Sequence, residues 1–275
     1  MYFSKAWHDC RTRVVVYILA AVSLGVLQGL DVLTAANMHT AFWPLHRAVR
    51  FRYSYDFHME VTVSAMSWAF LSWRGAWPNL IMFMAYWSMG IGPCAALLAG
   101  LGLGATSVGR EYGTGTMNFV LTRPEARRNF ILADWTVGLT GMVVMLGGMA
   151  LPLLPFLVAV EAKGAGNVLG VLPALWALGA ATYGLAQFTT LVGGSAPRGL
   201  ILSVATVSTY LFLPNALHDW WHVGGLSRAF EWTMRPFAFG AWPLDPFAWG
   251  PFGFWLAVAA GLMGVSMAWI RWREV

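Results

Sequence analysis

The sequence predicts an all-α membrane protein, on the basis of its composition, its long apolar stretches and the position of its basic residues. Of the 275 residues, 58% are hydrophobic and 11% are charged, and the mean hydropathy is +0.61. A soluble domain carries about a quarter charged residues, so this chain has too little polar surface for a water-soluble globule. The 16 Trp, 17 Phe and 8 Tyr exclude intrinsic disorder. The formal charge of +5 is attributed to Lys and Arg at the membrane face, and no nucleic-acid partner is expected.

Six stretches reach the roughly 20 apolar residues that a membrane-spanning helix needs. They run from Val14 to Leu33, from Trp77 to Thr106, from Phe130 to Val160, from about Val168 to Gly193, from about Gly199 to Leu213 and from about Phe247 to Ile270. Pro152 and Pro155 predict a kink or break near the far end of the third stretch. Pro214 is expected to end the short fifth stretch.

Basic residues predict the orientation of these spans. Six spans place both termini on one side, and that side then holds ten of the 17 Lys and Arg residues. Because cytoplasmic segments carry an excess of Lys and Arg, we expect a multi-pass protein of the inner cell membrane with both termini cytoplasmic. Residues 1–275 are interpreted as a single transmembrane domain.

Three further elements are predicted around the spans. The stretch 1–13 mixes aromatic and basic residues, which is typical of an interfacial helix on the inner leaflet. The long connection 34–76 is expected to form an outer segment. The outer stretch 214–246 is rich in aromatic residues, too apolar for a solvated loop and too interrupted by Pro and Gly for a span. We therefore interpret it as a re-entrant or interfacial element before the sixth span.

The cytoplasmic connection 107–129 is the most informative stretch. After a Gly-Thr turn, a short helix from about Thr116 would place Met117, Val120 and Leu121 on one face. Thr122 to Glu125 then matches a capping box with Pro124 in the first turn of the next helix. The pattern predicts an amphipathic helix under the membrane, which is either a docking element for a cytosolic partner or a plain interfacial loop.

The same stretch resembles the signature of ABC-2 type permease subunits, the membrane half of many bacterial ABC exporters. The resemblance rests on Glu111-x-Gly113-Thr114 followed by Leu121-x-x-Pro124-x-x-Arg127/Arg128-x-Phe130. It implies that this connection carries the coupling helix that contacts a separate ATPase. The residues it assigns to ATPase coupling are Arg110, Glu111, Gly113, Thr114, Met117, Val120, Leu121, Pro124, Arg127 and Arg128. A Lys that commonly follows the motif is replaced here by Asp134.

This resemblance also implies the partners and the activity. Neither of the two lysines, Lys5 and Lys163, follows the spacing of a phosphate-binding loop, so ATP and Mg are expected in a partner ABC ATPase and no cofactor in this chain. A second permease copy or a related permease would face this one within the lipid bilayer. The expected function is ATP-driven transport, most simply export, with no catalytic residue and no enzyme activity in the chain itself.

Small and polar residues within the spans are candidates for a translocation path or a dimer interface. Gly25-x3-Gly29 and Gly100-x3-Gly104 are spaced for close helix packing, and packing within the chain is the favoured interpretation. Gln28 and Gln187 are polar groups in apolar stretches. Gln187 is the best candidate for a path, although an interhelical hydrogen bond is favoured. Asp134 is interpreted as interfacial.

Two histidines define an alternative function. His218 and His222 lie one helical turn apart among tryptophans on the predicted outer side, a spacing that suits a metal. The alternative is a membrane-embedded metal or haem handling factor that uses this pair. Interfacial anchoring by the surrounding aromatic residues is the favoured interpretation, with no metal site. An intramembrane enzyme is a third interpretation, which predicts activity without an ATPase subunit.

Overall fold

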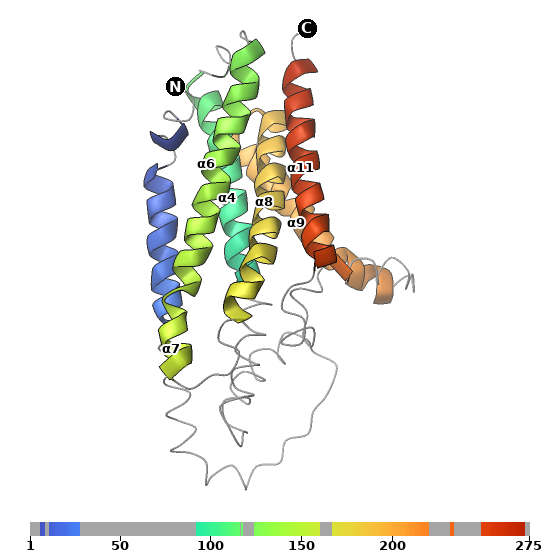
Figure 1. Ribbon diagram of the computed structural model, residues 1–275. Helices are drawn as coiled ribbons and strands as arrows, with labels where there is room; N and C mark the ends of the chain where they lie inside the picture. Colours follow the sequence, from blue (N-terminus) through green and yellow to red (C-terminus); the bar gives the residue numbers. More distant parts are fainter. Residues whose placement is uncertain are drawn as a thin grey trace.

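The computed structural model describes residues 6–8, 11–27, 92–115, 117, 124–159, 167–219, 232–233 and 249–272, and this part of the chain is helical without strands. A helix at 11–27 is followed by α4 (Gly92–Gly113), α6 (Pro124–Ala150), α7 (Leu153–Ala159), α8 (Asn167–Gly193), α9 (Ala196–Asp219) and α11 (Trp249–Trp272). Figure 1 shows the long helices side by side in an up-and-down bundle, with α7 extending α6 at the lower end.

Four of these helices are long and apolar enough to cross a membrane. They comprise Gly92–Gly113, Asn129–Phe156, Gly170–Gly193 and Gly250–Trp272. These four overlap the second, third, fourth and sixth predicted spans, and the first of them extends seven residues beyond the predicted end at Thr106. The helix at 11–27 and α9 overlap the first and fifth predictions, but neither is among the four. The chain is thus all-helical in its described part and has the character of a membrane protein.

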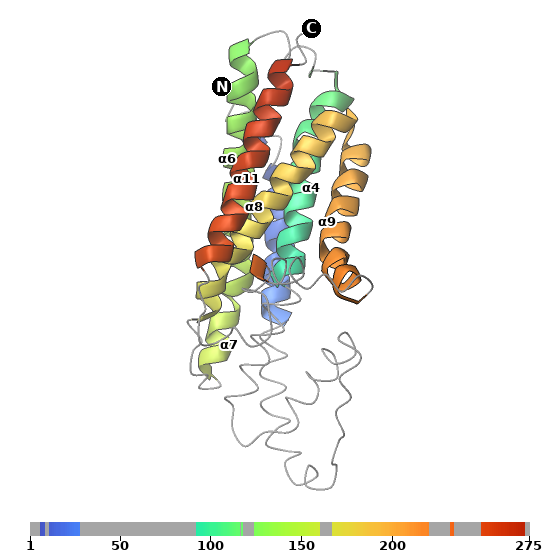
Figure 2. The ribbon, with the colours of Figure 1, turned by 90° about the vertical axis from the view of Figure 1, so that its right-hand side faces the viewer.

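The centre of the bundle is α8. It packs against α4, α6, α9 and α11 (Figures 1 and 2). Leu175, Ala177 and Ala186 are fully buried along its length. The apolar character of α8 around its whole circumference is compatible with burial on all sides.

Glycines allow the closest helix contacts. A Cβ atom at Gly100 would lie 2.5 Å from the carbonyl oxygen of Gly179, and one at Gly104 would overlap the carbonyl oxygen of Tyr183. Gly25 faces the backbone of Met149 in the same way. Small residues let membrane helices approach closely, and these three do so within the chain. These contacts agree with the favoured packing interpretation, whereas Gln28 and Gly29 lie outside the described residues.

Prolines were predicted to break the third span and to end the fifth, and the structure confirms only the first of these predictions. α6 ends at Ala150, residues 151–152 form a turn and α7 begins at Leu153, which confirms the break predicted from Pro152 and Pro155. α9 continues past Pro214 to Asp219, so the predicted end at Leu213 was wrong. Proline inside a helix can kink it without ending it, and the end of α9 turns away from the bundle in Figure 1.

The elements predicted outside the spans lie largely beyond the described residues. A helical turn at 6–8 and the start of the 11–27 helix belong to the predicted interfacial helix 1–13. The outer segment 34–76 lies entirely outside the described part. Of the stretch 214–246, the structure describes the end of α9 and residues 232–233.

Candidate functional site

The candidate site is the end of the bundle where α4 ends and α6 begins. Gly115 has a φ of 73° and its N–H donates to the Tyr112 carbonyl oxygen at 3.2 Å. The N–H of Thr114 donates to the Arg110 carbonyl oxygen at 2.9 Å. A glycine in the left-handed conformation after the last turn is a common helix C-cap. The predicted Gly-Thr turn is therefore the cap of α4.

The expected boundaries of the connection shift because of this cap. Residues 107–113 belong to α4, so Arg110, Glu111 and Gly113 are helical and do not lie in a loop. The capping box does mark a helix start, since α6 begins at Pro124. Arg127 and Arg128 lie in the first turns of α6, whereas Val120 and Leu121 lie outside the described residues.

Burial corrects the predicted roles of two motif residues. Glu111 is only 4% exposed and Met117 only 2% exposed, and Met117 belongs to the hydrophobic cluster of this chain. The expectation that Met117 contributes to an apolar face open to a partner is therefore wrong. Glu111, which the resemblance assigns to ATPase coupling, is also buried and offers no exposed charge to a partner. Arg110 and Thr114, in contrast, are exposed.

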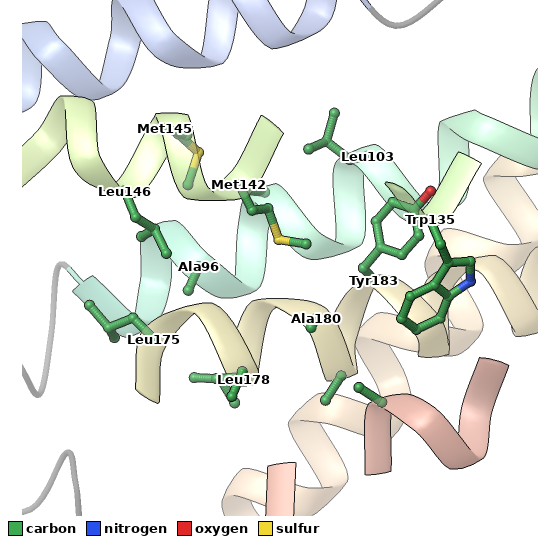
Figure 3. Packing of buried hydrophobic residues seen from close by; sticks show 14 of the residues in the cluster. Ala96, Leu103, Trp135, Met142, Met145, Leu146, Leu175, Leu178, Ala180 and Tyr183 are labelled. Atoms are coloured by element: carbon green, nitrogen blue, oxygen red, sulfur yellow. The ribbon is translucent and has the colours of Figure 1, made fainter. Parts of the chain in front are cut away.

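A buried hydrogen-bond network joins α6 to α8 near this end. Tyr183 donates its hydroxyl proton to Asp134 Oδ2 at 3.0 Å, and Gln187 Nε2 donates to the same oxygen at 2.8 Å. The indole N–H of Trp135 donates to Gln187 Oε1 at 2.5 Å. Trp135 and Tyr183 also meet edge to face, with ring centroids 5.3 Å apart (Figure 3). We call Asp134, Trp135, Tyr183 and Gln187 the α6–α8 polar network.

This polar network is connected to the motif through α4. Ser107 and Glu111 of α4 both lie close enough to the Asp134 carboxyl group to act on it electrostatically, while the Ser107 hydroxyl donates to the Gly104 carbonyl oxygen at 2.9 Å within α4. Both residues belong to the last turns of α4, next to the cap. Three helices thus meet at Asp134, and the residues before the connection are linked to the centre of the bundle.

Two polar residues of the spans can now be assigned. Gln187 is fully buried and makes an interhelical hydrogen bond, which confirms the favoured interpretation and places it in the packed interior. Asp134 is buried as well, so its interpretation as an interfacial residue was wrong. A signal for the network was present in the sequence, because Asp134 and Gln187 interrupt apolar stretches and Tyr183 precedes Gln187 by one helical turn.

Arginines gather at this same end of the bundle. In the part of the chain that the structure describes, every arginine lies near the start of 11–27, α6 or α9, or near the end of α4 or α11; these are Arg11, Arg13, Arg110, Arg127, Arg128, Arg198 and Arg271. Figure 1 shows these helix ends together at the top of the bundle. Arg13 Nη1 donates to the Thr106 carbonyl oxygen at 3.2 Å and ties the first helix to α4.

The structure describes only one of the two histidines on which the metal or haem alternative depends. His218 lies in the last turn of α9, and His222 lies outside the described residues. Within the described ranges, no three His, Cys, Asp or Glu residues form a group that could hold a metal ion.

No protein-family profile, curated protein or solved structure matches this chain. The arrangement of residues around the α4–α6 connection is therefore the basis for proposing a function.

Proposed function

We propose that the protein is the membrane-spanning permease subunit of an ATP-driven ABC transporter, working as an exporter with six spans and both termini in the cytoplasm. ATP and Mg bind to separate ATPase subunits, and a second permease faces this chain across the transport path. The observation that carries the proposal is the capped α4–α6 connection at the arginine-bearing end, because the motif residues flank it on both sides.

The mechanism follows from how this connection is attached. ATP-driven closure of the ATPase subunits pushes on residues 110–128. The buried α6–α8 polar network resists separation of these two helices, and the backbone contacts at Gly100 and Gly104 hold α4 against α8. In this proposal the three helices move together and the push reaches the transport path. Alternation between an inward-open and an outward-open arrangement then depends on the ATP-bound state of the partner.

Burial of Met117 and Glu111 moves the proposed ATPase contact to exposed neighbours. Arg110 and Thr114 are exposed at the end of α4, and Val120 and Leu121 follow in the connection. In this proposal Arg110 pairs with an acidic group of the ATPase. Truncating one partner of a buried interfacial charge pair costs about 2–5 kcal/mol, which weakens binding roughly 30-fold or more.

Co-purification with a charge-reversal variant tests the proposal. Affinity purification of the wild type from its native membranes is expected to recover a subunit with a phosphate-binding loop and vanadate-sensitive ATP hydrolysis. Arg110→Glu should reach normal membrane levels and lose both. Arg271→Glu is the matched control, since it reverses an exposed charge at the same end on α11, and it should keep both. Wild-type protein that recovers no ATPase activity would remove the basis of the proposal.

The metal or haem handling factor that uses His218 and His222 stays a prediction. Its test is the metal and haem content of the purified protein, in which a stoichiometric metal or haem lost from His218→Ala/His222→Ala would favour it.

A further inference from the structure

An apolar cavity of about 280 Å³ lies between α4, α8, α9 and α11. Its inner wall is formed by Leu178, Ala181 and Thr182 of α8. α9 and α11 both pack against α8 but make little contact with each other, and Figure 2 shows them on either side of α8. The cavity therefore lies in the wedge between two helices that diverge from a shared neighbour.

The polar groups around the cavity are satisfied by the protein. Thr182 Oγ1 donates to the carbonyl oxygens of Leu178 and Gly179, and Thr206 Oγ1 donates to that of Leu202 at 2.8 Å. Trp255 Nε1 donates to the Thr233 carbonyl oxygen at 3.1 Å, and the Tyr210 hydroxyl hydrogen-bonds the Thr233 hydroxyl. A buried water needs two to four polar partners, and this lining offers it none.

Aromatic side chains form one wall of the cavity. Tyr210 of α9 and Trp255 of α11 meet edge to face with centroids 5.6 Å apart, and Phe254 meets Trp255 in the same way at 5.3 Å. Thr233 fixes the first two rings through their polar atoms. These ring contacts and hydrogen bonds fix the aromatic wall of the cavity, which no described side chain fills.

The depth of the cavity indicates what fills it. Its α8 residues belong to the apolar helix Gly170–Gly193 and its α11 residues to Gly250–Trp272, two of the helices that are long and apolar enough to cross a membrane. At that depth the surrounding solvent is the hydrocarbon of lipid tails. Apolar cavities of roughly 150 Å³ stay dry and bind apolar molecules, and this cavity is larger.

We propose that this cavity is a binding site for one acyl chain of a bilayer phospholipid, which enters between α9 and α11. The site holds the chain against the aromatic wall and adds to the sparse contact between the two helices. The assignment rests on the cavity alone and is independent of the permease proposal.

Photocrosslinking in nanodiscs tests the site. The protein is reconstituted with a phosphatidylcholine that carries a diazirine in one acyl chain, and the labelled residues are located by mass spectrometry. Label is expected at Leu178 and Thr182, which are almost fully buried in the bundle and line the cavity. Ile201 and Val265 are exposed on the outside and report ordinary lipid contact.

Two cavity-filling variants and one control complete the experiment. Val207→Phe on α9 and Val258→Phe on α11 fill the cavity from opposite walls and should abolish label at Leu178 and Thr182 while Ile201 and Val265 stay labelled. Val204→Phe adds the same ring at an exposed position of α9 outside the lining and should change nothing. Wild-type protein labelled at Ile201 and Val265 but not at Leu178 or Thr182 would overturn the proposal. Label at Leu178 and Thr182 that persists in both filling variants would overturn it as well.

Discussion

Asp134 is an acidic residue within a helix apolar enough to cross a membrane, and its neighbours explain how it is accommodated there. A carboxyl group in such a place is costly unless it is hydrogen-bonded. Tyr183 and Gln187 both donate hydrogen bonds to the Asp134 carboxyl group from α8, and Trp135 in turn donates to Gln187. Because two donors from one neighbouring helix bind the same oxygen, the network specifies how α6 and α8 fit together as well as satisfying the acid.

Removing the acceptor should therefore cost more than removing the acidity. We expect Asp134→Leu to lower the free energy of unfolding in detergent by about 1–3 kcal/mol, because Tyr183 and Gln187 lose a buried partner. Asp134→Asn keeps an acceptor oxygen and should cost clearly less. Thermal or denaturant unfolding of both variants measures the difference. Equal loss in the two variants would mean that the carboxylate charge, and not the hydrogen bonds, stabilises this site.

At the scale of the helices, backbone contact between α4 and α8 sets the packing. Gly100 and Gly104 lie one turn apart and both face α8, where no side chain fits between the two backbones. Such contacts supply the dispersion energy that replaces a hydrophobic driving force between helices inside a membrane. The glycine spacing predicts close packing, but it contains no information on which helix is the partner.

Other features of the elements were predictable to differing degrees. Helix positions and the α6–α7 break follow from local signals, namely apolar length and Pro152 and Pro155. Burial of Glu111 and Met117 does not, because it depends on which helices surround the end of α4, and a single sequence does not specify this. The favoured interhelical role of Gln187 was correct for the physical reason that a buried amide needs partners, whereas naming Asp134 as its partner required the fold.

Matched glycine substitutions test the packing of α4 on α8. Gly104→Ala places a Cβ atom against the Tyr183 carbonyl oxygen, which cannot move without its helix, and we expect a loss of about 1–3 kcal/mol of stability from overpacking. Gly147→Ala in α6 meets nothing within 4 Å and should be neutral or stabilising by up to about 1 kcal/mol, since alanine favours helix. Unfolding midpoints of the purified variants give the comparison. A harmless Gly104→Ala would show that the two helices are not in backbone contact at this point.

At the scale of the whole molecule, the distribution of arginines gives the bundle two different ends. The described arginines collect where α4 ends and α6 begins, although they come from helices far apart in the sequence (Figure 1). The sequence count gave only a modest excess of basic residues on the predicted cytoplasmic side. The fold makes the charge asymmetry clearer, because helices that alternate in direction bring every described arginine to one end of the bundle. Under the positive-inside rule, we expect that end to face the cytoplasm.

Cysteine labelling tests this orientation in a background in which Cys10 and Cys94 are replaced by Ser. Thr114→Cys and Arg198→Cys lie at the arginine-bearing end, and Val158→Cys lies in α7 at the opposite end; all three positions are exposed. In spheroplasts we expect a membrane-impermeant maleimide to label Val158→Cys alone, and to label the other two only after the membrane is permeabilised. The reverse pattern would place the α4–α6 connection outside the cell, where no ATPase could reach it, and so would refute the permease proposal together with the orientation. Equal labelling of all three positions before permeabilisation would mean that the helices between them do not cross the membrane.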